Sequence, residues 1–310
     1  MALTDNQKDL IRCIVDNDLR KAKTLAKLIL EEDTSKKNEW FCKNMKDRLE
    51  NQHNFIELPG NLQSILTMED VSLNFKENRY LLTGSEEEIF NKIKQTNETN
   101  NKLTEMGIRY TNTTMLYGES GTGKTTFGRY VAYKLGLPFA YLNFSHCISS
   151  FLGETSKNIV KVFEYVSKQK CVFMIDEIDA IGIKRGKEDL GEMSRVVIGL
   201  MQAFDLLENG VIVIAATNRI DMIDKALLRR FNTVHEVKPL KPVQIEKLIY
   251  NFLKDINIEV NTYDLDVYCR LSNGKQSGII QDLIYCLIDM INNNSSEYRL
   301  VISSFNKKEF

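Results

Sequence analysis

The sequence has little of what marks a secreted, zinc-binding or membrane-spanning protein. Its six cysteines form no Cys-x-x-Cys pair and its three histidines form no ligand cluster, so neither a disulfide framework nor a zinc site is indicated. No apolar run approaches the roughly 18 residues that cross a bilayer, and the first ten residues lack the apolar core of a signal peptide. These absences favour a protein of the reducing cytoplasm with no membrane partner.

An excess of either charge is also missing. The 41 Lys and Arg residues are balanced by 42 Asp and Glu residues, which leaves a formal net charge of -1. Because no overall basic field attracts a polyanion, we do not expect a nucleic-acid partner. The hydrophobic content of 43% is that of an ordinary folded protein, and 310 residues correspond to about two domains.

The sequence contains only four prolines, so domain boundaries have to come from the hydrophobic pattern. Residues 1–84 have a helical pattern in which Thr4 and Gln7 fit a capping box. Ser85 and Glu88 fit the cap of a further, polar helix, which places a boundary near residue 84. We interpret residues 1–84 as a helical region that recruits a substrate or partner protein, although its aromatic residues can instead pack on a neighbouring element.

Short apolar runs alternate with helical segments in the middle of the chain. The runs lie at residues 113–117, 139–143, 171–175, 211–216 and 233–238. Unbroken apolar runs between helices are typical of strands that are buried on both faces of a parallel sheet. Residues 85–240 are therefore predicted to form an α/β domain with a five-stranded parallel sheet and helices on both faces.

The remaining residues, 241–310, have a purely helical pattern. One apolar stripe consists of Ile245, Leu248, Ile249, Phe252 and Leu253, and a second consists of Ile280, Leu283, Ile284, Leu287 and Ile291. Residues at these spacings lie on one side of a helix and pack together. The pattern predicts a small α-helical lid.

A phosphate-binding motif follows the first apolar run. The pattern G-x-x-x-x-G-K-[ST] is satisfied by Gly118-Glu119-Ser120-Gly121-Thr122-Gly123-Lys124-Thr125, and Thr126 continues into a helical segment, which is the context that a P-loop requires. Backbone N–H groups of such a loop surround phosphate oxygens at a helix N-terminus, the lysine lies on the β and γ phosphates, and the threonine hydroxyl is offered to Mg²⁺. The motif predicts a nucleotide and Mg²⁺ site.

Two later strands end in polar residues that suit the same chemistry. Asp176 follows the run at 171–175 and can hold Mg²⁺, and Glu177 can polarise the attacking water. Asn218 comes just after the run at 211–216, where it can bond the water or the γ-phosphate. Although acidic pairs also occur in ordinary turns, the preceding P-loop favours the catalytic interpretation.

With these motifs in this order, the chain resembles the AAA+ ATPases, specifically the classical AAA clade that includes katanin, spastin and the proteasomal ATPases. The resemblance extends over residues 113–290 and implies ATP and Mg²⁺ as cofactors. Arg229 and Arg230 match the arginines that reach the γ-phosphate of a neighbouring subunit, and this implies a homo-oligomer, expected to be a hexamer. The Pro-Gly pair usual between these arginines is missing, which leaves open which of them is the main finger.

The sequence departs from the family pattern in the P-loop and matches a further family motif near residue 277. Glu119 and Ser120 stand where the common P-loop has two prolines. Ser277 and Gly278 resemble the Ser-Gly-Ala motif of the same clade, where the turn lies against the adenine, although Gly278 is nearly as well explained as a plain helix-start residue.

The loop Phe151-Leu152-Gly153 resembles the aromatic pore loop of AAA translocases, which points into the channel of a ring and grips polypeptide through apolar contact. Phe151 can alternatively pack within its own domain. The segment 182–187, with three basic residues, has the place of a second pore loop. The resemblance implies ATP-driven protein remodelling or unfolding. The alternative is a nucleotide-dependent switch or loader that controls a partner without threading; any proteolysis needs a separate chain, since no H-E-x-x-H signature occurs.

Overall fold

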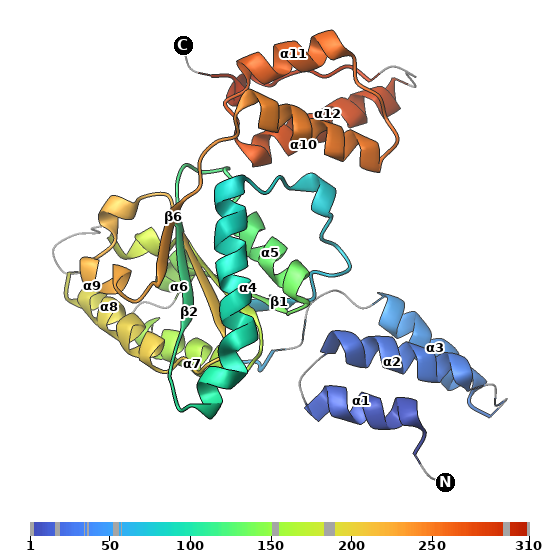
Figure 1. The fold of residues 1–310 in the computed structure, drawn as a ribbon, viewed down its shortest axis with the longest axis vertical. Coiled ribbons are helices and arrows are strands. Elements are labelled where there is room, and N and C mark those ends of the chain that lie inside the picture. Colours follow the sequence, from blue (N-terminus) through green and yellow to red (C-terminus); the bar gives the residue numbers. More distant parts are fainter. Residues whose placement is uncertain are drawn as a thin grey trace.

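A six-stranded sheet lies at the centre of the protein in this computed structural model (Figure 1). The structure describes residues 3–15, 19–33, 35, 37–51, 56, 58–150, 155–182, 190–293 and 298–308. In sheet order the strands run β1-β3-β4-β5-β2-β6. Their bounds are β1 Leu66–Glu69, β2 Asn112–Tyr117, β3 Phe139–Asn143, β4 Val172–Asp176, β5 Ile212–Thr217 and β6 Thr233–Glu236.

The five predicted strands form the parallel part of this sheet. Strands β3, β4, β5, β2 and β6 each run parallel to their sheet neighbours in that series, which confirms the predicted α/β class. The sheet has one strand more than expected, because β1 pairs antiparallel with β3 from Leu66↔Leu142 to Glu69↔Phe139. Strand β1 closes the edge of the sheet opposite β6.

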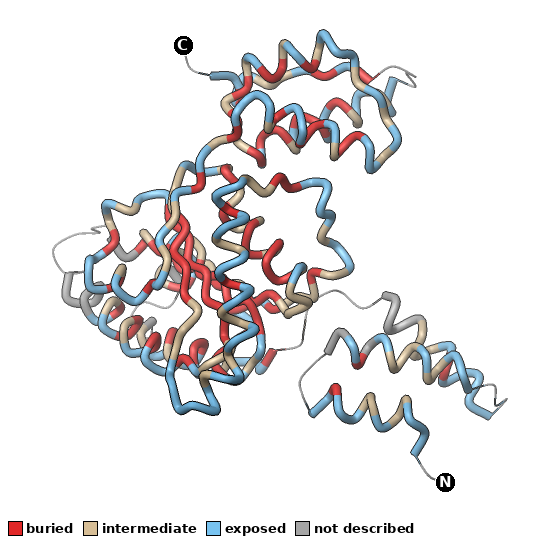
Figure 2. The backbone as a smooth tube through the Cα atoms, viewed as in Figure 1, coloured by how far each residue is buried: buried red, intermediate tan, exposed pale blue. Residues whose placement is uncertain are grey.

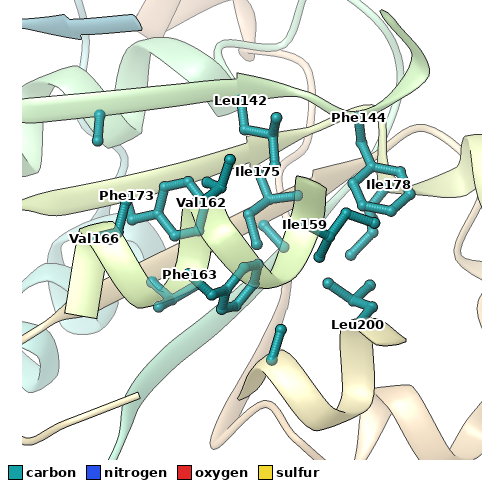
Figure 3. Packing of buried hydrophobic residues seen from close by; sticks show 14 of the residues in the cluster. Leu142, Phe144, Ile159, Val162, Phe163, Val166, Phe173, Ile175, Ile178 and Leu200 are labelled. Atoms are coloured by element: carbon teal, nitrogen blue, oxygen red, sulfur yellow. The ribbon is translucent and has the colours of Figure 1, made fainter. Parts of the chain in front are cut away.

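Helices cover both faces of the sheet, as the continuous burial of residues along β2, β4 and β5 requires. On one face, α4 and α5 pack on strand residues such as Leu116 and Met174. On the other, helices α6 to α9 pack on Phe173, Ile175 and their neighbours, which Figure 3 shows around α7. The bounds are α4 Gly84–Glu105, α5 Lys124–Leu135, α6 Phe144–Ser150, α7 Thr155–Ser167, α8 Leu190–Asp205 and α9 Lys225–Leu228.

Helix α4 begins before the residue that the sequence indicated. Its N-cap is Thr83, whose side chain accepts from the Glu86 N–H while the Glu86 carboxylate accepts from the Thr83 N–H. The predicted cap by Ser85 and Glu88 is therefore wrong. A capping box of the same kind two residues earlier is formed instead, because Glu86 also accepts a hydrogen bond from the Tyr80 hydroxyl at 2.7 Å, in a buried position.

The described residues of the N-terminal region form three helices, α1 Asp5–Val15, α2 Leu19–Glu32 and α3 Glu39–Asn51. Helix α2 contacts both α1 and α3. The capping box predicted at the start of α1 is confirmed: the Thr4 N–H donates to Gln7 Oε1 at 3.1 Å and the Gln7 N–H donates to Thr4 Oγ1 at 3.3 Å. None of the helices within the described residues is long and apolar enough to cross a bilayer.

The lid packs α10 Pro242–Asp255, α11 Thr262–Leu271 and α12 Gln276–Asn292 around a core of its own (Figure 2). The first predicted stripe is confirmed, since all five of its residues are buried on α10. The second is partly wrong: Leu283 is buried as predicted, but Ile284 and Ile291 are exposed, because α12 turns Ile279 and Cys286 toward the lid core.

The C-terminal segment, residues 298–308, lies against the start of α12. Asn306 is buried, and its side-chain amide donates to the Gly278 carbonyl at 2.9 Å. A Cβ atom added at Gly278 would overlap the Asn306 side-chain oxygen. A side chain at position 278 would therefore displace the Asn306 amide from its hydrogen bond with the Gly278 carbonyl.

Candidate active site

The predicted P-loop connects β2 to α5 at the carboxyl end of the parallel strands. Its backbone has positive φ at Gly118, Gly121 and Gly123, and α5 begins directly after the last of these. Gly118 also passes so close to the neighbouring chain that a Cβ atom would overlap the Val237 carbonyl. The loop therefore takes a conformation that brings several N–H groups to the start of a helix, where anions bind.

Lys124 is the first residue of α5 and is buried. Its ammonium group donates to the carbonyls of Gly118 and Glu119 at 2.8 Å each and to Asn218 Oδ1 at 2.7 Å. Burial lowers the pKa of Lys124, while the carboxylates of Asp176, Asp179 and Glu119 oppose that shift. The structure thus brings together the P-loop lysine and the asparagine that follows β5.

Thr125 and Asp176 meet across the gap between α5 and β4. The Thr125 hydroxyl donates to Asp176 Oδ2 at 2.6 Å, and the Tyr141 hydroxyl reaches the same oxygen at 3.4 Å. A threonine hydroxyl beside a carboxylate supplies the hard oxygen ligands that Mg²⁺ takes in phosphate sites. Both residues predicted to bind the metal are therefore adjacent.

Glu177 follows β4 directly and is exposed. Its φ of 56° lies in the left-handed region, which is uncommon for a residue other than glycine. Its N–H donates to Asp176 Oδ1 at 3.0 Å, so the carboxylate of one acidic residue fixes the backbone of the next. Strained residues of this kind concentrate at functional sites.

The donor set as a whole fits a Mg²⁺-bound nucleotide. P-loop N–H groups and the Lys124 ammonium suit phosphate oxygens, and Thr125 and Asp176 suit the metal. These groups share one edge of the sheet because β2, β4 and β5 are parallel, so that their carboxyl ends coincide. The chemistry of the site agrees with the predicted cofactors, ATP and Mg²⁺.

The structure places Arg229 and Arg230 far from this edge. The Arg230 carbonyl accepts from Thr113 Oγ1 at 2.8 Å, near the amino end of β2, whereas the P-loop follows Tyr117 at its carboxyl end. Four strand residues put roughly 13 Å between the two positions. The Arg230 guanidinium pairs with both carboxylate oxygens of Asp205, at 2.8 Å and 3.2 Å.

Arg229 differs from its neighbour. It caps the C-terminus of α9 and is exposed. Within the described part of the chain, no residue forms an ion pair or a side-chain hydrogen bond with its guanidinium group. The two arginines thus differ in their partners among the described residues, a distinction that the sequence Arg-Arg does not show.

The lid reaches the P-loop through the start of α12. The Ser277 N–H and Oγ both donate to the Gly121 carbonyl, at 3.1 Å and 3.2 Å. Gly278 lies beside Asn306 as described above. The structure also adds two residues that the sequence did not single out, Lys275, which pairs with Glu119 at 3.1 Å, and Gln276. Their position just before Ser277 was the only local signal.

The predicted pore loop, Phe151-Leu152-Gly153, lies outside the described residues, as do residues 183–187 of the second loop. The flanking helices are described: α6 ends at Ser150 and α7 begins at Thr155. The first loop is thus the connection that follows β3 and α6.

Comparison with known proteins identifies relatives of the central region. Residues 114–239 match the AAA family, described as the ATPase family associated with various cellular activities. The proteasome-activating nucleotidase of Saccharolobus solfataricus is 36% identical over 189 residues, which cover 58% of this chain and 47% of the nucleotidase. The ATP-dependent zinc metalloprotease FtsH of Mycoplasmoides gallisepticum is 34% identical over 174 residues, 53% of this chain and 23% of the protease.

A third relative matches over a longer stretch. The "Uncharacterized AAA family ATPase y4kL" of Sinorhizobium fredii is 29% identical over 231 residues, which cover 71% of this chain and 68% of that protein. The nucleotidases are matched over only about half of their length. The similarity therefore centres on the sheet and the site described above.

Proposed function

This chain contains an AAA ATPase domain, and we propose that it hydrolyses ATP in a homo-oligomeric ring, a hexamer, in order to unfold or remodel a protein substrate. The sequence-based identification of the classical AAA clade is confirmed at the level of this domain. The oligomer, the substrate and the role of each site residue belong to the proposal.

Nucleotide binding is assigned to the P-loop edge of the sheet. Residues 118–126 would hold the phosphates, with the Lys124 ammonium as the fixed positive charge. Thr125 and Asp176, whose Oγ1 and Oδ2 atoms are 2.6 Å apart, would hold Mg²⁺. When bound, the metal would neutralise charge on the β and γ phosphates. Ser277 and Gly278 would complete the site from the lid side.

Hydrolysis is assigned to Glu177 and Asn218. Glu177 would accept the proton of the attacking water, since its carboxylate is exposed at the end of β4 next to the metal ligand Asp176. Asn218 would orient that water or the γ-phosphate, and its bond to Lys124 at 2.7 Å keeps its amide at the phosphate end of the site.

The proposal of an oligomer rests on one observation. The arginines lie at the amino end of β2, at the opposite end of the strand from the P-loop of the same chain. They are therefore assigned to the active site of a neighbouring subunit. An arginine supplied in this way raises turnover by about 10³- to 10⁵-fold in analogous enzymes. Arg229 is proposed as the main finger because Arg230 is held by Asp205.

The protein substrate is proposed from two features. Phe151, Leu152 and Gly153 would form the pore loop that grips polypeptide in the channel. Residues 1–84 would recruit the substrate or a partner, for which the exposed Trp40 and Phe41, 76% and 53% accessible, offer aromatic contact area. A relative named for activating a proteasome supports a protein partner. We place this activity in the cytoplasm and assign it no nucleic-acid or membrane partner.

The decisive test measures assembly and unfolding together. The molecular masses of the full chain and of Glu177→Gln are measured in solution with ADP and with ATP. A hexamer that forms with ATP supports the ring. Unfolding of a tagged fluorescent protein is then followed with Phe151→Ala and Phe151→Tyr. We expect Phe151→Ala to hydrolyse ATP but to lose unfolding, and Phe151→Tyr to keep it.

The outcomes separate the candidate functions. If Phe151→Ala acts on the substrate as well as wild type, threading is wrong and the nucleotide-dependent switch or loader takes its place. If the chain stays monomeric in every nucleotide and still hydrolyses ATP at full rate, the proposed ring and the trans arginines are both wrong.

A further inference from the structure

The side chain of Gln276 joins the lid to a segment almost two hundred residues earlier. Gln276 is 4% exposed. Its Oε1 accepts from the Leu81 N–H at 3.0 Å, and its Nε2 donates to the Leu81 carbonyl at 3.1 Å. Because a carboxamide holds its donor and acceptor in one plane, this pair of hydrogen bonds fixes the orientation of the side chain as well as its position.

The residues on either side of Gln276 hold the P-loop. The Lys275 ammonium pairs with the Glu119 carboxylate, and Ser277 donates twice to the Gly121 carbonyl. Three consecutive residues at the start of α12 therefore bind two different parts of the ATPase domain. Glu119 stands where proline is common in related P-loops, so this ion pair does not follow from the family resemblance.

The segment that receives Gln276 is itself firmly attached. The Tyr80 hydroxyl donates to Glu86 at 2.7 Å, and Glu86 accepts from Thr83 in the capping box of α4. The Tyr80 ring also lies against the P-loop, 3.1 Å from the place of a Cβ atom at Gly123. The Leu81 peptide is thus a fixed point next to the phosphate-binding loop.

We propose that Gln276 is a positioning residue for the nucleotide site. By binding the Leu81 peptide, it keeps the first turn of α12 in the one place from which Lys275 and Ser277 reach the P-loop. The lid then holds the Gly121 peptide in its observed orientation. This inference rests on the proposed ATP-binding function and adds a residue that acts on the site without touching phosphate.

The test replaces Gln276 with methionine, which has a similar length but cannot form either bond. Gln281→Met is the matched control, because Gln281 lies on the same helix and is exposed. Affinity is measured with mant-ADP and turnover with saturating ATP. Loss of two hydrogen bonds is expected to weaken mant-ADP binding about 10-fold in Gln276→Met, with kcat changed less than about 2-fold and with no change in Gln281→Met.

A second readout needs no nucleotide. In amide hydrogen exchange, residues 81 and 118–123 should exchange faster in Gln276→Met than in wild type or in Gln281→Met. If Gln276→Met does not fold, Gln276→Glu is used, which keeps the acceptor for the Leu81 N–H and loses the donor; its thermal unfolding is recorded beside the exchange.

The outcomes separate this inference from the proposed function. Wild-type mant-ADP affinity together with wild-type exchange at residues 118–123 overturns the positioning role. Faster exchange confined to residue 81 also overturns it, because the P-loop would then be independent of the bond. If wild type itself binds no nucleotide, the proposed function is wrong, and the exchange measurements still decide whether Gln276 holds the P-loop.

Discussion

The two ends of the parallel strands use their charged side chains in different ways. At the carboxyl end, the side chains of the predicted site residues are hydrogen-bonded to one another within the chain, Lys124 to Asn218 and Thr125 to Asp176. Near the amino end, Arg230 is held by Asp205, but Arg229 has no partner among the described residues. At the carboxyl end, a single chain therefore positions the site residues by itself. At the amino end, the Arg229 guanidinium is exposed and can contact another molecule.

The largest loss of ATP turnover should come from replacing the arginine near the amino end of the strands. We expect Arg229→Ala to lower ATP turnover about 10³-fold, because a charge that stabilises the transition state in a neighbouring subunit is lost. ATP affinity should stay within about 2-fold, since the P-loop of each chain is intact. Steady-state hydrolysis and equilibrium binding measure the two quantities.

Mixed oligomers provide the control. Asp176→Ala lacks the metal ligand but retains Arg229, so adding it to Arg229→Ala should restore part of the activity in mixed rings. Co-assembly is verified by mass. No recovery at any mixing ratio would mean that the arginine acts within its own chain and that the two ends of the sheet are not complementary.

The next effect concerns the carboxyl end. Glu177→Gln should bind ATP and assemble but hydrolyse it about 10²- to 10³-fold more slowly, because the general base is lost while Thr125 and Asp176 remain bonded. Lys124→Ala should instead weaken ATP binding itself. Equal loss of affinity in both variants would contradict the separate roles given to these residues.

A smaller effect is expected from the tethered arginine. Arg230→Ala should lower turnover less than about 10-fold, since its guanidinium is committed to Asp205 and an exposed ion pair of this kind contributes about 0.2–1 kcal/mol. Asp205→Asn should lower it less still. A loss in Arg230→Ala as large as in Arg229→Ala would show that the tether opens in the working assembly.

The smallest effect lies at the contact between lid and P-loop. Lys275→Gln should speed mant-ADP release about 2- to 5-fold by removing the pair with Glu119, and the difference should shrink at high salt. Lys94→Gln removes an exposed pair with Glu98 on α4, beside the amino end of β2, and should leave release unchanged. Stopped-flow fluorescence distinguishes the two.

The fold was predictable where one stretch of sequence carries the whole signal. Strands β2, β3, β4 and β5 are largely apolar runs because residues on both of their faces are buried, whereas the edge strand β6 is less buried. Strand β1 was missed because it has four residues, of which only alternate ones are buried, and because its partner β3 comes about seventy residues later. A short edge strand is defined by that partner, which local sequence does not reveal.

Local sequence likewise predicts some residues of the site and not others. Lys124, Asp176 and Asn218 could be placed together because parallel strands bring their carboxyl ends to one edge. The Gln276–Leu81 pair could not, since it joins residues 195 apart through a carboxamide that has no distinctive pattern. The unequal surroundings of Arg229 and Arg230 were hidden for the same reason, because Asp205 lies on a different helix.

Strand β1 also has a mechanical consequence. It is the first element of the central sheet that the chain enters after the N-terminal helices, and it pairs with β3, the strand that leads through α6 to residues 151–154. Glu69 at its end is bonded to Arg129 of the P-loop helix α5 at 2.9 Å. If α1–α3 hold a cargo as proposed, its tension would therefore reach the sheet through four residue pairs beside the segment that leads to the proposed pore loop.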